Sequence, residues 1–148
     1  MDTKNILLVF TKEIMYKPII YRLVKDFEIV FNVLEAKIYP KQEGRIILEL
    51  RGEKKSINKS ILYLKKEGVK VEVLAKLIKR DEKKCVHCGA CTAVCRLEAL
   101  SIDRETMEVI FDPSKCVACG LCRKACPVKA MSGVNINDKF QNYESKGL

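Results

Sequence analysis

The first 74 residues alternate between short apolar runs and amphipathic stretches, a pattern typical of a small domain of strands and helices. Asn5–Thr11 is a continuous apolar run that predicts a buried strand. Val30–Tyr39 and Arg45–Arg51 follow a two-residue period, which indicates strands with one face toward a core. Val69–Leu74 shows the same alternation. Four strands are therefore expected in this part of the chain.

The two-residue period also predicts which side chains of the middle strands share a face. In the earlier strand the residues expected on one side are Asn32, Leu34, Ala36 and Ile38. In the later strand the inward residues are Ile46, Leu48 and Leu50, and the outward residues are Arg45, Glu49 and Arg51. A turn over Pro40–Gly44 is expected between the two strands.

Two amphipathic stretches between these strands predict helices. Pro18 suits the first position of a helix whose apolar face holds Ile20, Leu23, Val24 and Phe27. Lys54–Glu67 predicts a second helix that buries Ile57, Ile61 and Leu64, and Gly68 suits its C-terminal cap. The order β-α-β-β-α-β predicts an α+β fold with both helices on one face of an antiparallel sheet. That fold serves many functions, so it identifies none by itself.

All eight cysteines lie in a segment that repeats itself. Cys85-Val-His-Cys88-Gly-Ala-Cys91-Thr-Ala-Val-Cys95 returns 31 residues later as Cys116-Val-Ala-Cys119-Gly-Leu-Cys122-Arg-Lys-Ala-Cys126. Ser101–Phe111 predicts a hairpin between the copies, Ala75–Lys84 a charged connector before them, and Asp138–Leu148 a polar tail. The expected domains are thus residues 1–76, residues 77–137 and a tail of residues 138–148.

The cysteine spacing is typical of a bacterial-type ferredoxin domain with two [4Fe–4S] clusters. Three cysteines at two-residue spacing allow one loop to reach three iron corners, and Gly89 and Gly120 let the backbone pass close to the metal. In two-cluster ferredoxins the fourth cysteine of each run binds the other cluster. This crossed rule assigns Cys85, Cys88, Cys91 and Cys126 to cluster 1, and Cys116, Cys119, Cys122 and Cys95 to cluster 2.

Zinc and disulfides are the alternatives for these cysteines. A tetrahedral zinc site has no use for a third cysteine at two-residue spacing, and cytosolic thiols seldom form disulfides. His87 is the only histidine, and Rieske-type ligation needs two, so we expect it to face solvent or lie beside a ligand. Pro127 follows Cys126 as the motif requires, whereas Arg96 follows Cys95, which should alter only local packing and the potential.

The net charge of +9 raises the question of nucleic acid, but its distribution argues against that partner. The lysines are scattered, and two clusters with their thiolates lower the charge of the loaded chain to roughly +5. Cations near the second motif suggest either charge compensation or docking to an acidic partner; they are Lys115, Arg123, Lys124 and Lys129. The apolar runs are too short to span a membrane, and residues 1–4 do not begin a secretory signal, so a cytoplasmic location is expected.

Part of the chain resembles the NIL domain, a methionine-linked module attached to ATPase subunits of methionine importers. The resemblance covers Tyr21–Leu74 and lies in Phe31–Ile38, Gly44-Arg45, Leu50–Gly52 and Tyr63–Leu74. Asn32-Val33-Leu34 occupies the place of the triplet that gives the module its name, with valine in place of isoleucine. The whole chain resembles the NIL–ferredoxin proteins of anaerobes, the iron–sulfur subunits of L-aspartate semialdehyde sulfurtransferase.

This resemblance implies a function in methionine biosynthesis. In that family a partner subunit joins reduced sulfur to aspartate semialdehyde to make homocysteine, and the ferredoxin supplies electrons. No cysteine remains once two clusters are filled, so we expect the chain to have no catalytic residues of its own. A general low-potential electron carrier and a methionine-sensing module coupled to a ferredoxin are the alternatives. A methionine-like ligand and homodimerisation, both through the NIL part, are further expectations.

Overall fold

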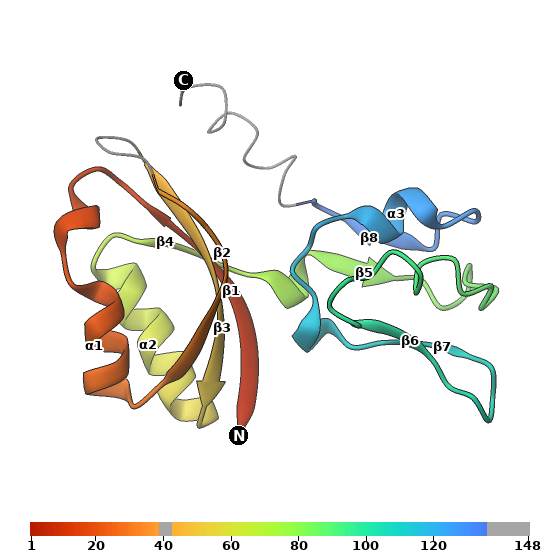
Figure 1. Cartoon of the computed structure of the whole chain (residues 1–148), viewed down its shortest axis with the longest axis horizontal. Coiled ribbons are helices and arrows are strands. Elements are labelled where there is room, and N and C mark those ends of the chain that lie inside the picture. Colours follow the sequence, from red (N-terminus) through yellow and green to blue (C-terminus); the bar gives the residue numbers. More distant parts are fainter. Residues whose placement is uncertain (39–42, 136–148) are drawn as a thin grey trace. The chain divides into compact units, whose positions relative to one another are not determined.

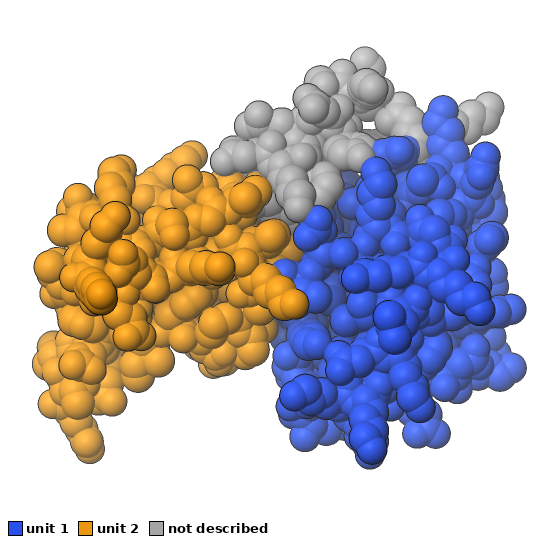
Figure 2. Space-filling model, turned by 180° about the vertical axis from the view of Figure 1, so that it is seen from behind, with its two compact units in different colours: residues 1–73, 142–148 blue, residues 74–141 orange. Residues whose placement is uncertain are grey.

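A computed structural model describes residues 1–38 and 43–135 of the 148-residue chain (Figure 1). The described residues form two compact units that divide between Val73 and Leu74, and Figure 2 colours them separately. A domain boundary at residue 76 stays a prediction. The predicted tail, residues 138–148, lies outside the described residues, as does most of the predicted turn over Pro40–Gly44.

The first unit is a four-stranded antiparallel sheet with two helices on one face (Figure 1). Its strand order is β2-β3-β1-β4, so the first strand lies between the third and the fourth. The prediction of an α+β fold with the order β-α-β-β-α-β is confirmed. The elements are β1 (Asp2–Phe10), α1 (Ile19–Phe27), β2 (Val30–Lys37), β3 (Gly44–Gly52), α2 (Lys54–Lys66) and β4 (Lys70–Val73), with a 3-10 turn at Ile14–Tyr16.

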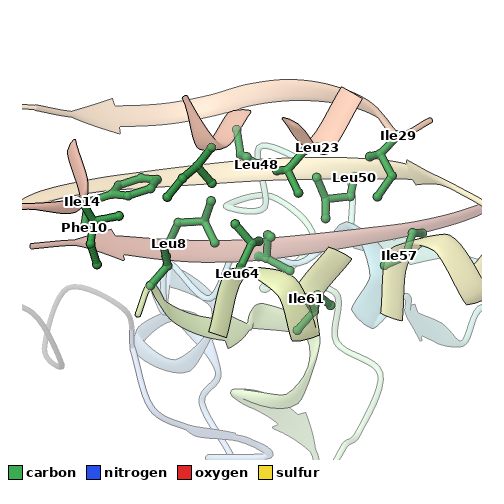
Figure 3. Packing of buried hydrophobic residues seen from close by; sticks show 13 residues of the cluster. Leu8, Phe10, Ile14, Leu23, Ile29, Leu48, Leu50, Ile57, Ile61 and Leu64 are labelled. Carbon is green, nitrogen blue, oxygen red and sulfur yellow. The ribbon is translucent and has the colours of Figure 1, made fainter. Parts of the chain in front are cut away.

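The core of this unit lies between the helices and the sheet. Leu8, Leu48 and Leu50 point from the sheet toward Leu23 of α1 and Leu64 of α2 (Figure 3). Helix α2 has the predicted buried face, and Gly68 follows it with a φ of +91°, which a side chain would strain. Within the described residues, the core of this unit contains no cysteine.

Helix α1 differs slightly from the prediction. Pro18 caps the helix from outside, and the first helical residue is Ile19. Ile19 and Leu23, four residues apart, form the buried line of the helix. Val24 was predicted inside, but 47% of it is exposed because it lies at the edge of this apolar stripe.

Strand β2 contains a bulge that the sequence pattern conceals. The pairing with β3 shifts between Val33 and Glu35, which leaves Leu34 as the extra residue. Side chains before and after a bulge no longer follow one alternation. The prediction that Asn32, Leu34, Ala36 and Ile38 share a side is therefore wrong; the Asn32 side chain donates instead to Glu49 at 3.2 Å.

Arg45 has the predicted direction but not the predicted exposure. The unbroken pairing of β3 with β1 places it on the face away from Ile46, Leu48 and Leu50, yet only 7% of it is exposed. Its guanidinium donates to the carboxylate of Glu35 on β2 at 2.9 Å. Because a buried cation needs such a partner, the ion pair accounts for the burial of Arg45.

The second unit consists of two small antiparallel sheets, one helix and long loops. Strand β5 (Ile78–Arg80) pairs with β8 (Met131–Gly133), and β6 (Leu100–Ile102) pairs with β7 (Val109–Phe111) as the predicted hairpin. The remaining elements are the 3-10 turns Leu74–Lys76 and Pro113–Lys115 and helix α3 (Leu121–Ala125). Ala75–Lys84 is therefore wrongly predicted as a connector, since it supplies a strand of this unit. Among the described residues, every helix is too short or too polar to cross a membrane.

Candidate metal centre

The strands of the second unit repeat at the same 31-residue offset as the cysteines, so the unit consists of two similar halves. Strand β5 corresponds to β7 and β6 corresponds to β8, and each half lends a strand to the other. Ile78 pairs with Gly133, and their counterparts Val109 and Ile102 pair with each other. The unit therefore has an approximate two-fold symmetry with interleaved halves.

The repeat begins earlier than the cysteine motif that revealed it. Asp81 accepts a hydrogen bond from the backbone N–H of Lys83 at 3.0 Å, and Asp112 accepts one from Ser114 at the same distance. For Asp112 the side-chain hydrogen bond of Ser114 is the main cause that lowers its pKa. The sequence contained this signal, because Ile78 matches Val109 and Lys84 matches Lys115 at the same offset.

Backbone conformation repeats with the same spacing around the cysteines. Positive φ angles occur at three pairs of positions: His87 and Ala118, Gly89 and Gly120, and Glu98 and Lys129. Two of these positions are glycines for a steric reason as well. A Cβ on Gly89 would come within 2.9 Å of Ile102, and one on Gly120 within 2.6 Å of Asn135. Both loops therefore make the same tight turn beside their cysteines.

The cysteines of the first run surround a pocket together with one cysteine of the second. The pocket has about 320 Å³ of empty volume, and Cys126 lines it with the first three cysteines of the other run, Cys85, Cys88 and Cys91. Burial raises the pKa of Cys91, and the charges of Cys85, Cys126 and Cys88 raise it further. These four thiols thus lie close enough to repel one another as thiolates.

The remaining cysteines form a second group, which combines the first three cysteines of the second run with Cys95, the last cysteine of the first run. Burial raises the pKa of Cys116, and the nearby charges that add to it are those of Cys119 and Cys95. Burial also raises the pKa of Cys122 to about 11, and Cys116, Cys119, Cys91 and Cys95 contribute. Several thiolates in a small buried volume need a positive core between them, which iron supplies.

Backbone N–H groups point at one sulfur atom in each of the two groups of cysteines, both within the second run. Ala118 donates to Cys116 Sγ and Ala130 donates to Cys126 Sγ, each at 3.3 Å. Burial acts to raise the pKa of Cys126, but backbone donors from Ala130, Val128, Met131 and Lys129 outweigh it and leave that pKa below its ordinary value. Such donors favour thiolate over thiol and so suit a metal ligand.

The fourth cysteines are reached in two different ways. In the second run α3 carries the chain from Cys122 to Cys126, whose N–H donates to the Cys122 carbonyl at 3.1 Å. In the first run turns replace the helix before Cys95, and Arg96 is exposed where Pro127 stands in the other copy. The two halves are therefore alike in their ligands and different in the approach to the last one.

His87 lies beside a cysteine, which is one of the two positions expected for it. Its Nδ1 accepts the backbone N–H of Val109 at 3.0 Å and is 4.0 Å from Cys85 Sγ. Because that lone pair is used, the neutral ring carries its proton on Nε2. Of the cations near the second motif, Lys115, Lys124 and Lys129 are exposed.

Family models match both units of the chain. The NIL domain matches residues 4–73, and the 4Fe-4S dicluster domain matches residues 84–130. Together with the two groups of cysteines, this defines the class: an α+β protein that joins a NIL domain to a ferredoxin domain with two [4Fe–4S] clusters. The described cysteines fit those clusters, because backbone N–H groups stabilise their thiolates and the glycine turns bend both loops tightly beside them.

Curated relatives identify the family more closely. The chain is 44% identical over 95 residues to the L-aspartate semialdehyde sulfurtransferase iron-sulfur subunit of Methanocaldococcus jannaschii, with 64% of this chain and 70% of the relative covered. The subunit of the same name from Methanosarcina acetivorans is 33% identical over 100 residues, with 68% and 74% covered. The chain belongs to the family of these iron–sulfur subunits.

The NIL part has relatives of its own. It is 35% identical over 71 residues to the methionine import ATP-binding protein MetN of Halalkalibacterium halodurans, which covers 46% of this chain and 21% of that protein. The C-terminal domain of an ABC transporter ATP-binding protein from Enterococcus faecalis aligns with a TM-score of 0.47 and 26% identity, covering 51% of this chain and 87% of that domain.

Proposed function

We propose that this chain is the electron-transfer subunit of a sulfurtransferase and delivers electrons to a separate catalytic subunit that makes homocysteine. The observation that carries the proposal is the union of a NIL domain and a two-cluster ferredoxin in one chain, together with the names of the two relatives above. The ferredoxin part supports the role in electron transfer, and the names of the two relatives support the sulfurtransferase reaction that uses the electrons.

The chemistry of that reaction explains why an electron donor is needed. Aspartate semialdehyde is an aldehyde, whereas homocysteine is a thiol on a saturated carbon. Exchange of the aldehyde oxygen for sulfide releases water but leaves the carbon at the aldehyde oxidation level. Conversion to the thiol then consumes two electrons and two protons. Each bound cluster supplies one electron, so one fully reduced chain matches one turnover.

The ligand sets proposed for the clusters are the crossed ones. Cluster 1 takes Cys85, Cys88 and Cys91 with Cys126, and cluster 2 takes Cys116, Cys119 and Cys122 with Cys95. The pocket shared by Cys126 and the first run supports the first set. The charge of Cys95 acting on Cys116 supports the second set.

The proposal can be tested with the anaerobically purified protein. Pull-down from the native host should recover one catalytic partner in stoichiometric amount. Reduced chain, mixed with that partner, sulfide and aspartate semialdehyde in a single turnover, should give about one homocysteine per two electrons. Oxidised chain serves as the matched control and should give none. Recovery of several unrelated oxidoreductases and equal homocysteine from oxidised chain would instead favour the general electron carrier.

Several properties of the assembly belong to the same proposal. The catalysis lies on the partner, and the complex works in the cytoplasm. The NIL part, near residues 1–76, forms its own domain before the ferredoxin domain of residues 77–137. Edge strand β2 supports a homodimer through the NIL part, since it exposes the apolar residues Val30, Val33 and Leu34.

A methionine-like ligand on the NIL part is a second candidate function, supported by one pocket. The pocket has about 640 Å³ of empty volume at the start of α1 and the end of α2, and its lining includes Lys17, Arg22, Tyr63 and Glu67. Cationic and anionic side chains together suit the carboxylate and ammonium of an amino acid. Calorimetric titration with methionine should show binding that Arg22→Gln weakens and that Lys25→Gln, on the same helix, leaves unchanged. Equal binding by both variants would contradict this site.

A further inference from the structure

The two halves of the ferredoxin unit differ in several charged residues, and one of them, Arg80, lines the pocket of the first group of cysteines. Arg80 at the end of β5 corresponds, 31 residues on, to Phe111 at the end of β7. The flanking cysteines and capping aspartates are the same in both halves, whereas the charges around them also differ at other positions, such as Thr92 and Arg123. Arg80 is distinguished by its place: it puts a mostly buried cation at the pocket wall where the other half has the apolar ring of Phe111.

The Arg80 side chain lies against the first group of cysteines. It lines the same pocket as Cys85, Cys91 and Cys126, and only 13% of the side chain is exposed. Its Nη1 donates to the carbonyl oxygen of Val109, the residue whose N–H binds His87 beside Cys85. A backbone partner therefore fixes the guanidinium at the wall of this pocket.

The charge of Arg80 is only weakly compensated. Its Nη2 is 3.7 Å from the Glu82 carboxylate, whose side chain is 84% exposed and therefore largely screened by water. Arginine keeps its proton at any ordinary pH, so the positive charge is permanent. None of the four cations near the second motif lines this pocket: Lys115, Lys124 and Lys129 are exposed and screened in the same way as Glu82, and Arg123 is half-buried beside Cys122.

Reduction adds one electron, and hence one negative charge, to a cluster. A fixed cation at the wall of a partly buried site stabilises that added charge more than a screened one does. We propose that Arg80 selectively raises the reduction potential of the cluster held by Cys85, Cys88, Cys91 and Cys126, so that an electron shared by the two clusters rests there. The inference rests on the crossed ligand sets proposed above, not on the identity of the reaction.

The consequence for electron transfer is directional. Cys88 is the only exposed cysteine of the eight and belongs to this same group. An electron that rests on the first cluster is therefore held where a ligand reaches the surface. Electrons would then leave the protein from the cluster held by Cys85, Cys88, Cys91 and Cys126, beside the exposed Cys88.

The test is a redox titration of the loaded, full-length protein at one fixed pH, followed by electron paramagnetic resonance. Wild type should show two one-electron steps. In Arg80→Gln the upper step should fall by about 59 mV, the shift that corresponds to a tenfold change for one electron, and the lower step should stay. Hyperfine-shifted NMR signals of Cys85 and Cys116 assign each step to its cluster.

Three further variants make the test decisive. Arg80→Lys keeps the charge and should retain most of the upper potential. Arg104→Gln removes the same charge from the exposed hairpin turn of the same unit and should move neither step. Glu82→Gln leaves Arg80 in place and removes a carboxylate that water largely screens, so it should raise the upper step by well under about 59 mV and leave the lower step unchanged, which provides a result even where Arg80→Gln does not load its clusters. Equal shifts of both steps, or an Arg80→Gln profile like wild type, would overturn the inference whatever reaction the protein serves.

Discussion

The backbone N–H of Asp81 donates to the carbonyl oxygen of Ala130 at 2.8 Å. Asp81 precedes the first cysteine run, whereas Ala130 follows the last cysteine of the second run and donates its own N–H to Cys126 Sγ. The symmetric bond joins Asp112 to Ala99 at 2.7 Å. Each half of the ferredoxin unit therefore begins where the other half ends, and the described strands of each half pair only with strands of the other.

Metal removal should consequently unfold the second unit and spare the first. Loaded protein should contain about eight iron and eight sulfide per chain, as two cubanes require. The small sheets of the second unit bury little apolar surface, so binding and folding are coupled there. Chelation of iron under reducing conditions should abolish the protection of β5–β8 amides in hydrogen exchange. Protection of β1 and β3 amides should persist, and its simultaneous loss would contradict two independent units.

Gly133→Ala should damage the second unit more than any other single methyl addition in β8. Gly133 has a φ of +122°, and a Cβ there would overlap the carbonyl oxygen of Leu77 on the neighbouring chain segment. Strain and backbone displacement together should cost at least about 3 kcal/mol. The measurement is the temperature at which visible cluster absorbance is lost. Ser132→Ala, at the adjacent exposed position, is the control and should change it little.

Most of the fold could be predicted from local pattern because the first unit obeys simple periodicities. Ile57, Ile61 and Leu64 recur at helical spacing along α2 and are buried. The errors occur at residues whose position or burial depends on how neighbouring strands pair. Leu34 is an extra residue only relative to β3, and the buried Arg45 depends on Glu35, its diagonal neighbour on β2, for a partner. Neither relationship is visible in one stretch of sequence.

For the candidate site, too, local sequence predicted one part and strand pairing decided the other. Their spacing predicted the class of cluster, because a loop that reaches several iron corners needs that spacing. The cation beside the first group of cysteines was missed. Arg80 lay in a segment predicted to be a connector, and its position beside Cys85 depends on the pairing of β5 with β8. Extension of the 31-residue repeat back to Ile78 would have found that strand.

Leu64→Ala should destabilise the NIL unit without disturbing the clusters. Leu64 is fully buried in the core between α2 and the sheet. Truncation of a buried leucine leaves a cavity and typically costs about 2–5 kcal/mol. Chemical denaturation of a fragment of residues 1–76 should show one cooperative transition, shifted by that amount in the variant. Leu62→Ala on the same helix, where 67% of the side chain is exposed, should shift it by less than about 0.5 kcal/mol.

Exchange of single cysteines should show that each cluster spans both repeats. Cys126→Ser removes a ligand from the pocket of Cys85, Cys88 and Cys91, so we expect the cluster of the first run to be lost or its spectrum altered. Cys95→Ser should affect the cluster of Cys116, which senses the charge of Cys95.

Iron analysis and electron paramagnetic resonance of the two reduced variants provide the readout for this crossed pattern. Each variant should keep about four of eight irons, and the two surviving spectra should differ from each other. Hyperfine-shifted NMR signals then identify the survivor: Cys116 should keep its signal in Cys126→Ser, and Cys85 should keep its signal in Cys95→Ser. Thr92→Ser, which lies between cysteines without being a ligand, controls for disturbance of the loop and should retain both clusters. Survival of the opposite signals would mean that each run binds its own fourth cysteine, and the crossed ligand sets would then be wrong.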